Sequence, residues 1–145
     1  MSAMSDALNL HYNVDGENFT SAGEASVQVK KILRQMGFPP EVIRRVSIAM
    51  YEGEINMVIH AGGGKADVNV YPEKIQVILA DKGPGIPDIA LAMQEGYSTA
   101  PDNIRSLGFG AGMGLPNMKR YSDSMDIQST PGEGTTITME ILLSQ

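Results

Sequence analysis

The sequence contains no cysteine, only two histidines and few aromatic residues. Without cysteine the chain can form neither a disulfide framework nor a thiolate metal site, and two histidines are too few for a zinc cluster. These absences favour a reducing compartment, and we expect a cytoplasmic protein.

The sequence also lacks an apolar run long enough to span a membrane, and its N-terminus lacks the basic segment and apolar stretch of a signal peptide. We therefore expect neither a membrane segment nor secretion. The net charge of -6 argues against nonspecific binding to nucleic acid or anionic lipid, because both would repel an acidic surface. A length of 145 residues, 42% of them hydrophobic, fits one domain over residues 1–145.

Hydrophobic periodicity predicts a series of strands and helices. The predicted strands are Leu8–Val14, Ala66–Tyr71, Lys74–Ala80, Ser124–Ser129 and Thr135–Leu143. The predicted helices are a segment between Ser21 and Gly37, Pro40–His60, Ile89–Glu95 and Gly114–Tyr121, with a mobile loop over 97–112. Short turns join the strands as hairpins. We expect an α+β fold, a two-layer α/β sandwich whose mixed, mostly antiparallel sheet has helices on one face.

The second predicted helix carries a carboxylate and an amide one turn apart, Glu52 and Asn56. This spacing places both at one margin of a buried stripe, while Glu54 points away from them. There the carboxylate can accept a proton and the amide oxygen can bind a metal ion. The pair also fits a solvated helix edge, and Gly53 fits either a ligand or close packing on a sheet. The predicted stripe is Val42, Val46, Ala49, Met50, Gly53 and Met57.

A second segment begins at Asp81, which ends an apolar strand and precedes Gly83 and Gly85. An aspartate at a strand end can accept a hydrogen bond from an exocyclic amino group. Two glycines one residue apart let a flat ring lie against bare backbone. The alternative is a turn rich in glycine and proline that the aspartate caps.

A third segment has alternating glycines, Gly108, Gly110, Gly112 and Gly114, and leads into a predicted helix. Alternating glycines leave backbone amides free to face an anion, and a helix N-terminus adds a favourable dipole. The spacing matches neither of the common phosphate-binding loops. A hinge without a ligand therefore stays an equal alternative.

Together, in order and separation, the three segments resemble the three boxes of the gyrase, chaperone, histidine-kinase and mismatch-repair ATPase superfamily. Within it, Tyr97–Thr99, Gly110–Arg120 and Gly132–Thr136 are similar to the bacterial anti-sigma-factor and switch-kinase family. The resemblance extends from about Leu8 to Leu142 and is greatest for switch kinases that phosphorylate a scaffold or antagonist protein.

This resemblance implies the Bergerat ATP-binding fold, with ATP and Mg²⁺ as ligands. By resemblance, Glu52 is the general base and Asn56 the magnesium ligand. Asp81 binds the adenine amino group, and Gly83 and Gly85 make room for the ring.

The resemblance also implies a phosphate-binding lid over about 97–114, formed by Gly108, Gly110, Gly112 and Gly114. Thr135 supports the adenine end beside Asp81. Arg105 and Lys119 are candidate phosphate contacts. The sequence departs from the family in two places, at Gly53, where a larger residue is expected, and in an extra stretch over 101–107.

The function implied is an ATP-dependent serine/threonine protein kinase of a bacterial partner-switching pathway. Its substrate is a STAS-domain antagonist or scaffold protein; a sigma factor or a phosphatase is a further partner, and a homodimer fits the family. The alternative is an ATP-binding anti-sigma factor or adaptor that acts by sequestration. A split histidine kinase fits less well, because the chain has no room for a helical hairpin with an acceptor histidine. His60 is interpreted as a helix-end cation or a core-edge residue.

Overall fold

The computed structural model describes residues 8–16, 23–86, 89–93 and 114–143. The predicted loop over 97–112, with Gly108, Gly110 and Gly112, lies outside the described residues, as does the extra stretch 101–107.

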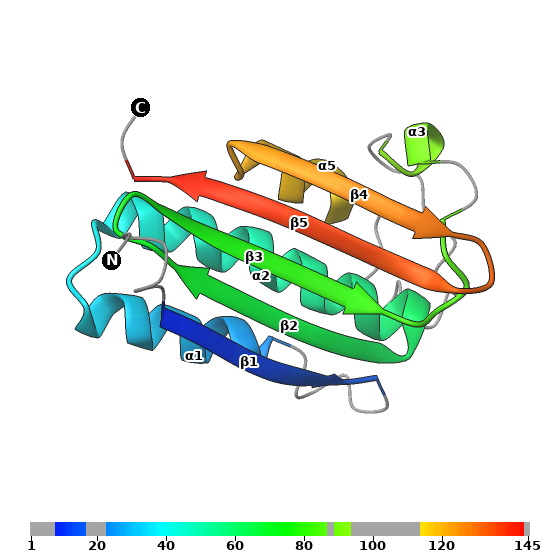
Figure 1. Ribbon diagram of the computed structural model, residues 1–145, viewed down its shortest axis with the longest axis horizontal. Coiled ribbons are helices and arrows are strands. Elements are labelled where there is room, and N and C mark those ends of the chain that lie inside the picture. The colour runs from blue at the N-terminus through cyan, green and yellow to red at the C-terminus, as the bar shows by residue number, and fades with distance from the viewer. Residues whose placement is uncertain (1–7, 17–22, 87–88, 94–113, 144–145) are drawn as a thin grey trace, which may run out of the picture.

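One five-stranded sheet runs through the molecule in the order β1-β2-β3-β5-β4 (Figure 1). Its strands are β1 (Leu8–Asp15), β2 (Gly63–Val70), β3 (Lys74–Asp81), β4 (Ser124–Thr130) and β5 (Gly134–Leu142). Every pairing among them is antiparallel, and both predicted hairpins, β2–β3 and β4–β5, are confirmed. The mostly antiparallel sheet expected from the sequence thus has no parallel pair among the described strands.

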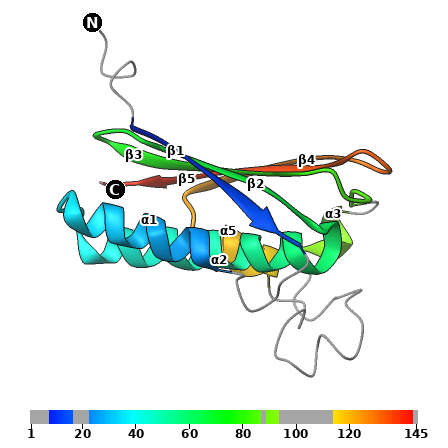
Figure 2. The ribbon, with the colours of Figure 1, turned by 90° about the horizontal axis from the view of Figure 1, so that it is seen from below.

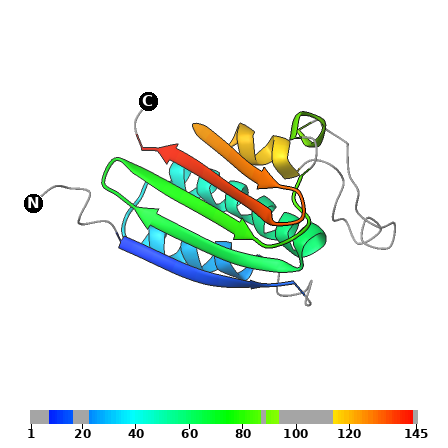
Figure 3. The ribbon, with the colours of Figure 1, turned by 45° about the vertical axis from the view of Figure 1, so that its right-hand side comes forward.

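Helices cover one face of this sheet, and Figure 2 shows the two layers edge on. The helical layer contains α1 (Glu24–Gln35), α2 (Pro40–Ala61) and α5 (Gly114–Arg120). The short α3 (Ile89–Ala92) lies at the end of the sheet where β3 and β4 terminate (Figure 3). The two-layer α+β sandwich is confirmed. Among the described helices, none has the length and apolar character needed to cross a membrane.

Of the three glycines at positions 62–64, only Gly62 ends α2. Gly62 adopts φ 71° and donates its N–H to the carbonyl of Met57, as expected for a helix C-cap. Gly63 and Gly64 already belong to β2 and pair with β1. A Cβ on Gly63 would lie 2.3 Å from the carbonyl oxygen of Val14, so the strand backbones approach too closely for a side chain. The strand therefore starts earlier than the predicted Ala66.

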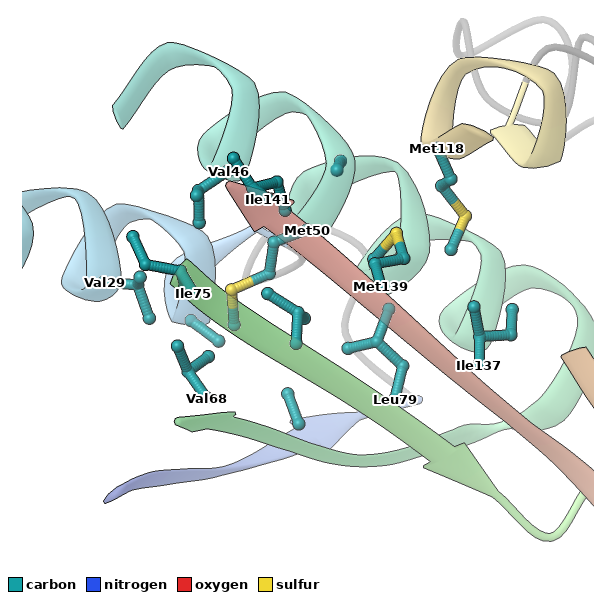
Figure 4. Packing of buried hydrophobic residues seen from close by; sticks show 14 of the residues in the cluster. Val29, Val46, Met50, Val68, Ile75, Leu79, Met118, Ile137, Met139 and Ile141 are labelled. Carbon is teal, nitrogen blue, oxygen red and sulfur yellow. The ribbon is translucent and has the colours of Figure 1, made fainter. Parts of the chain in front are cut away.

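The core fills the space between helices and sheet, as Figure 4 shows for Val46 and Met50 of α2 above Ile75 of β3 and Ile141 of β5. Strict alternation along the central strands sends every second side chain into this layer. All six members of the predicted α2 stripe are buried: Val42, Val46, Ala49, Met50, Gly53 and Met57.

Gly53 lies where α2 packs against side chains of β3 and α5. A Cβ on this residue would lie 2.0 Å from Leu79 Cδ1 of β3 and 3.1 Å from Met118 Cε of α5. Helix-on-sheet packing therefore accounts for the glycine. The departure from the family pattern has a structural cause in the neighbouring Leu79 and Met118 side chains.

A Gly53→Ala substitution is expected to lower the free energy of unfolding. At an approach of 2.0 Å overpacking costs about 2–3 kcal/mol, and the better helix propensity of alanine returns about 1 kcal/mol, so the net loss is roughly 1–2 kcal/mol. Urea denaturation measures it. Gly114→Ala is the matched control, because among the described residues a Cβ there meets only Asn56 Oδ1, at 3.9 Å. Equal unfolding midpoints for Gly53→Ala and the parent protein would contradict the packing argument.

Candidate functional site

The described site residues gather along the C-terminal half of α2. Glu52 and Asn56 lie one turn apart on this helix, and a Cβ built on Gly114 would lie 3.9 Å from Asn56 Oδ1. Further along, a Cβ built on Gly83 would lie 2.6 Å from the Cβ of Ala61. With a rise of about 1.5 Å per residue, Glu52 and Ala61 are about 14 Å apart along the axis. Segments far apart in the sequence therefore meet beside a few turns of one helix.

Asp81 ends β3 with one carboxylate oxygen engaged. Its Oδ1 accepts the backbone N–H of Gly83 at 2.9 Å and that of Thr135 at 3.2 Å. The side chain is partly exposed, and Oδ2 receives no hydrogen bond from the described residues. Asp81 thus caps the turn, as the alternative interpretation proposed, but this role uses only its Oδ1. The second oxygen can still accept a hydrogen bond from a ligand amino group.

Thr135 pairs with Asp81 across β3 and β5, as predicted. It is 6% exposed, and its Oγ1 lies 2.8 Å from Oγ of Ser129 on the neighbouring strand β4. Ser129 Oγ also accepts the backbone N–H of Ile86 at 2.7 Å. A small polar network therefore connects β4, β5 and the segment that follows Asp81.

Both glycines after Asp81 are required by contacts within the protein. Gly83 abuts Ala61, as described above. Gly85 has φ +80°, and a Cβ there would lie 2.6 Å from the carbonyl oxygen of Thr130. Room for a flat ring over Gly83 and Gly85 stays a prediction.

Glu52 is partly buried, and its Oε1 lies 3.5 Å from Nδ2 of Asn117 on α5, at the long end of the hydrogen-bond range. Burial raises the pKa of the Glu52 carboxyl, and the Asn117 contact opposes this shift. A carboxylate with a raised pKa is a better proton acceptor near neutral pH than a fully solvated one.

The donor set beside Glu52 fits Mg²⁺ in one respect. Within the described ranges, no group of three or more histidine, cysteine, aspartate or glutamate side chains could hold a metal. Mg²⁺ sites that also bind phosphates use few protein ligands, and the rest are phosphate oxygens and waters. A single hard oxygen from Asn56 is compatible with such a site.

Of the glycine run, the structure describes Gly114, which begins α5 beside Asn56. Lys119 is exposed on the same helix. The assignments of Gly108, Gly110, Gly112 and Arg105 concern residues outside the described ranges.

Sequence reasoning correctly turned Glu54 away from Glu52 and missed what it does. Glu54 is 2% exposed and accepts the backbone N–H groups of Gly23, Ala25 and Ser26, at 3.0, 3.2 and 2.6 Å. It therefore caps α1, whose N-cap Gly23 has no capping side chain. Burial raises the pKa of the Glu54 carboxyl, and the three N–H groups oppose this shift. The sequence carried one signal for this role: α1 begins after Gly23, which has no side chain to cap the helix, so another residue must supply the cap.

The two histidines lie apart from these residues. His60 is partly buried near the end of α2, and burial lowers the pKa of its imidazole. This favours the interpretation as a core-edge residue over that as a helix-end cation. His11 on β1 lies opposite Asp67 of β2, with 2.6 Å between Nδ1 and Oδ1.

Comparison with known proteins shows the family of this chain. Residues 18–141 match the profile of the histidine kinase-like ATPase domain. The serine/threonine-protein kinase RsbT of Bacillus subtilis is 32% identical over 112 residues, which are 74% of this chain and 78% of that protein. The anti-sigma F factor of Pasteuria penetrans is 30% identical over 132 residues, 83% of this chain and 85% of that protein.

A solved structure shares the fold. The RsbU and RsbW domains of Rv1364c from Mycobacterium tuberculosis superpose with a TM-score of 0.63 and 16% identity, covering 93% of this chain and 32% of that one. At this identity the likeness concerns the fold alone. The profile match and the two relatives carry the assignment further: the chain belongs to the histidine kinase-like ATPase family, in its group of partner-switching kinases and anti-sigma factors.

Proposed function

We propose that the chain is an ATP-dependent serine/threonine protein kinase of a bacterial partner-switching pathway. Membership of the histidine kinase-like ATPase family implies ATP binding. One observation carries the kinase proposal: Glu52, a partly buried carboxylate with a raised pKa, lies one turn from Asn56 on the helix that also borders the Asp81 segment. This arrangement supports a proton acceptor and a metal ligand at one end of a nucleotide site.

At the adenine end, Oδ2 of Asp81 accepts a hydrogen bond from the exocyclic amino group, and Thr135 lies beside it in the sheet. Gly83 and Gly85 present backbone to the ring. In the proposal, Gly108, Gly110, Gly112 and Gly114 contact the phosphates as a lid. These roles rest on the motif resemblance together with the positions of Asp81, Thr135 and Gly114.

At the phosphate end, Glu52 and Asn56 hold the reacting groups. Asn56 would hold Mg²⁺ through its side-chain oxygen, and the ion would supply positive charge that offsets charge on the transferring phosphoryl group. Glu52 accepts the proton of a serine or threonine hydroxyl on the partner protein. The hydroxyl oxygen bonds to the γ-phosphorus as the bond between that phosphorus and the bridging oxygen breaks, and ADP leaves with the electron pair.

The partner in this proposal is a STAS-domain antagonist or scaffold protein. A second candidate function is sequestration of a sigma factor with little transfer. The name of the Pasteuria penetrans relative, an anti-sigma F factor, favours it. The same nucleotide pocket serves both functions, so they are distinguished by whether phosphate is transferred to a partner or a sigma factor is bound.

Two measurements test the proposal. Titration calorimetry with ADP and Mg²⁺ is expected to give heat of binding. Absence of this heat would contradict the proposed nucleotide site. The protein is then incubated with γ-labelled ATP, Mg²⁺ and the purified products of its neighbouring genes. Transfer of label to one of them supports the kinase. Binding of ADP without labelling, together with co-purification of a sigma factor, would replace the kinase by sequestration.

A further inference from the structure

Ser129 occupies an unusual place in β4. The side chains of this edge strand alternate, with Met125, Ile127 and Ser129 turned toward the helices and the intervening residues exposed. Met125 and Ile127 pack against the core, so the row ends in a hydroxyl. A partly buried hydroxyl needs polar partners, and Ser129 Oγ has three within reach.

Counting protons assigns directions to these contacts. Ser129 Oγ accepts the N–H of Ile86 at 2.7 Å, so its own single proton goes either to Thr135 Oγ1 at 2.8 Å or to the carbonyl of Gly134 at 3.3 Å. Hydrogen bonds between oxygens have a usual range of about 2.5–3.0 Å. The Thr135 contact lies within that range and the Gly134 contact lies outside it. Either hydroxyl can donate in the contact between Ser129 and Thr135, and the distances favour Ser129 as the donor.

This direction determines what Thr135 can offer. With Ser129 as the donor, the proton of Thr135 Oγ1 is free to turn toward Asp81, with which Thr135 is paired in the sheet. Asp81 Oδ2 is an acceptor, so an acceptor and a donor stand side by side. The edge of adenine presents an amino donor next to the N1 acceptor, which complements that pair. Guanine presents a carbonyl acceptor to the Asp81 carboxylate, which is a mismatch, and an N–H donor where an oriented Thr135 hydroxyl offers its proton.

Ser129 also anchors the segment that follows Asp81. The Ile86 contact ties the end of this segment to β4, and Gly132 donates its N–H to the carbonyl of Pro84 at 2.8 Å. Without the Ser129 hydroxyl, the Ile86 N–H loses its partner, and the Thr135 hydroxyl is no longer oriented by Ser129.

We propose that Ser129 is a positioning residue for base recognition, which orients the Thr135 hydroxyl and anchors the Asp81 segment so that adenine is preferred to guanine. The inference rests on the proposed nucleotide site and adds a determinant of its specificity. Ser129 acts through Thr135 and Ile86 and does not itself contact the base.

Calorimetric titration of the full chain with ADP and with GDP, each with Mg²⁺, tests this role. Ser129→Ala is expected to weaken ADP binding by about tenfold and GDP binding much less, so that the ratio of the two affinities falls by a similar factor. Ser129→Thr keeps the hydroxyl and is expected to restore the ratio. Ser124→Ala removes an exposed hydroxyl from the same strand and is expected to leave both affinities unchanged.

Two further variants keep the test decisive. Ser129→Cys, with a weak donor and acceptor, replaces Ser129→Ala if the alanine protein does not fold. Thr135→Val removes the oriented donor, leaves the Ile86 contact in place and is expected to lower the ADP to GDP ratio as well. A lower melting temperature with an unchanged ratio would make Ser129 merely structural and overturn the inference. Absence of ADP binding by the parent protein would instead overturn the proposed function, and this inference with it.

Discussion

Glu52→Gln is expected to slow phosphate transfer from ATP to the partner protein by about 10²–10⁴-fold. The substitution keeps the size of the side chain and its contact with Asn117, and it removes the group that accepts the proton. Since Glu52 lies a full turn from Asn56 and far along α2 from the Asp81 segment, nucleotide affinity should change little. The expected signature is a lower rate of transfer at unchanged affinity for ADP.

Single-turnover labelling of the partner measures the rate, and calorimetry with ADP measures the affinity. Glu41→Gln is the matched control, because Glu41 is an exposed glutamate in the first turn of the same helix. A Glu52→Gln protein that transfers phosphate at the parent rate would eliminate the general base. Transfer and ADP binding lost together would assign Glu52 to nucleotide binding instead.

Glu54→Ala is expected to lower the free energy of unfolding by about 3 kcal/mol or more. The carboxylate accepts three backbone N–H groups at the start of α1 that have no other partner among the described residues, and each buried donor left unsatisfied costs about 1–3 kcal/mol. For a protein of this size, 3 kcal/mol corresponds to a fall in melting temperature of roughly 6–12 °C. Such a loss is a large part of the stability of an ordinary domain.

Thermal and urea unfolding of Glu54→Ala measure this loss. Glu54→Gln keeps one acceptor oxygen and turns an amide toward the N–H groups, so an intermediate loss is expected. Glu41→Gln again serves as control, since an exposed ion pair with Arg44 at 3.6 Å contributes about 0–1 kcal/mol. Parent-like unfolding of Glu54→Ala would mean that the cap of α1 does not depend on this carboxylate.

Local patterns were enough to predict the elements of the fold. Alternation along β3 and β5 and the apolar stripe of α2 repeat over many residues, so each pattern specifies which face is buried. Pro40 and Gly62 mark the ends of α2 through their own backbone preferences. The start of β2 was missed because Gly63 and Gly64 read as helix terminators, and only their pairing with β1 makes them a strand.

The site was predicted in part. Asp81, Thr135, Glu52 and Asn56 were predicted as site residues because the order and spacing of their motifs resemble a known family, and their roles stay predictions. The contact of Ser129 with Ile86 and that of Asn117 with Glu52 were not predicted, because the partners lie 43 and 65 residues apart in the sequence. A serine near the end of a strand has no distinguishing local pattern.

The amino-acid sequence alone determined the α+β class, the buried faces and the candidate site residues, because these depend on periodicity and side-chain type. Only the tertiary structure decided how Glu54 and Gly53 are used. Both depend on contacts between elements: Glu54 of α2 meets the N-terminus of the neighbouring helix α1, and Gly53 meets Leu79 of the sheet. Such contacts exist only when α2 is packed, since hydrogen bonds and close approach act through space and not along the chain.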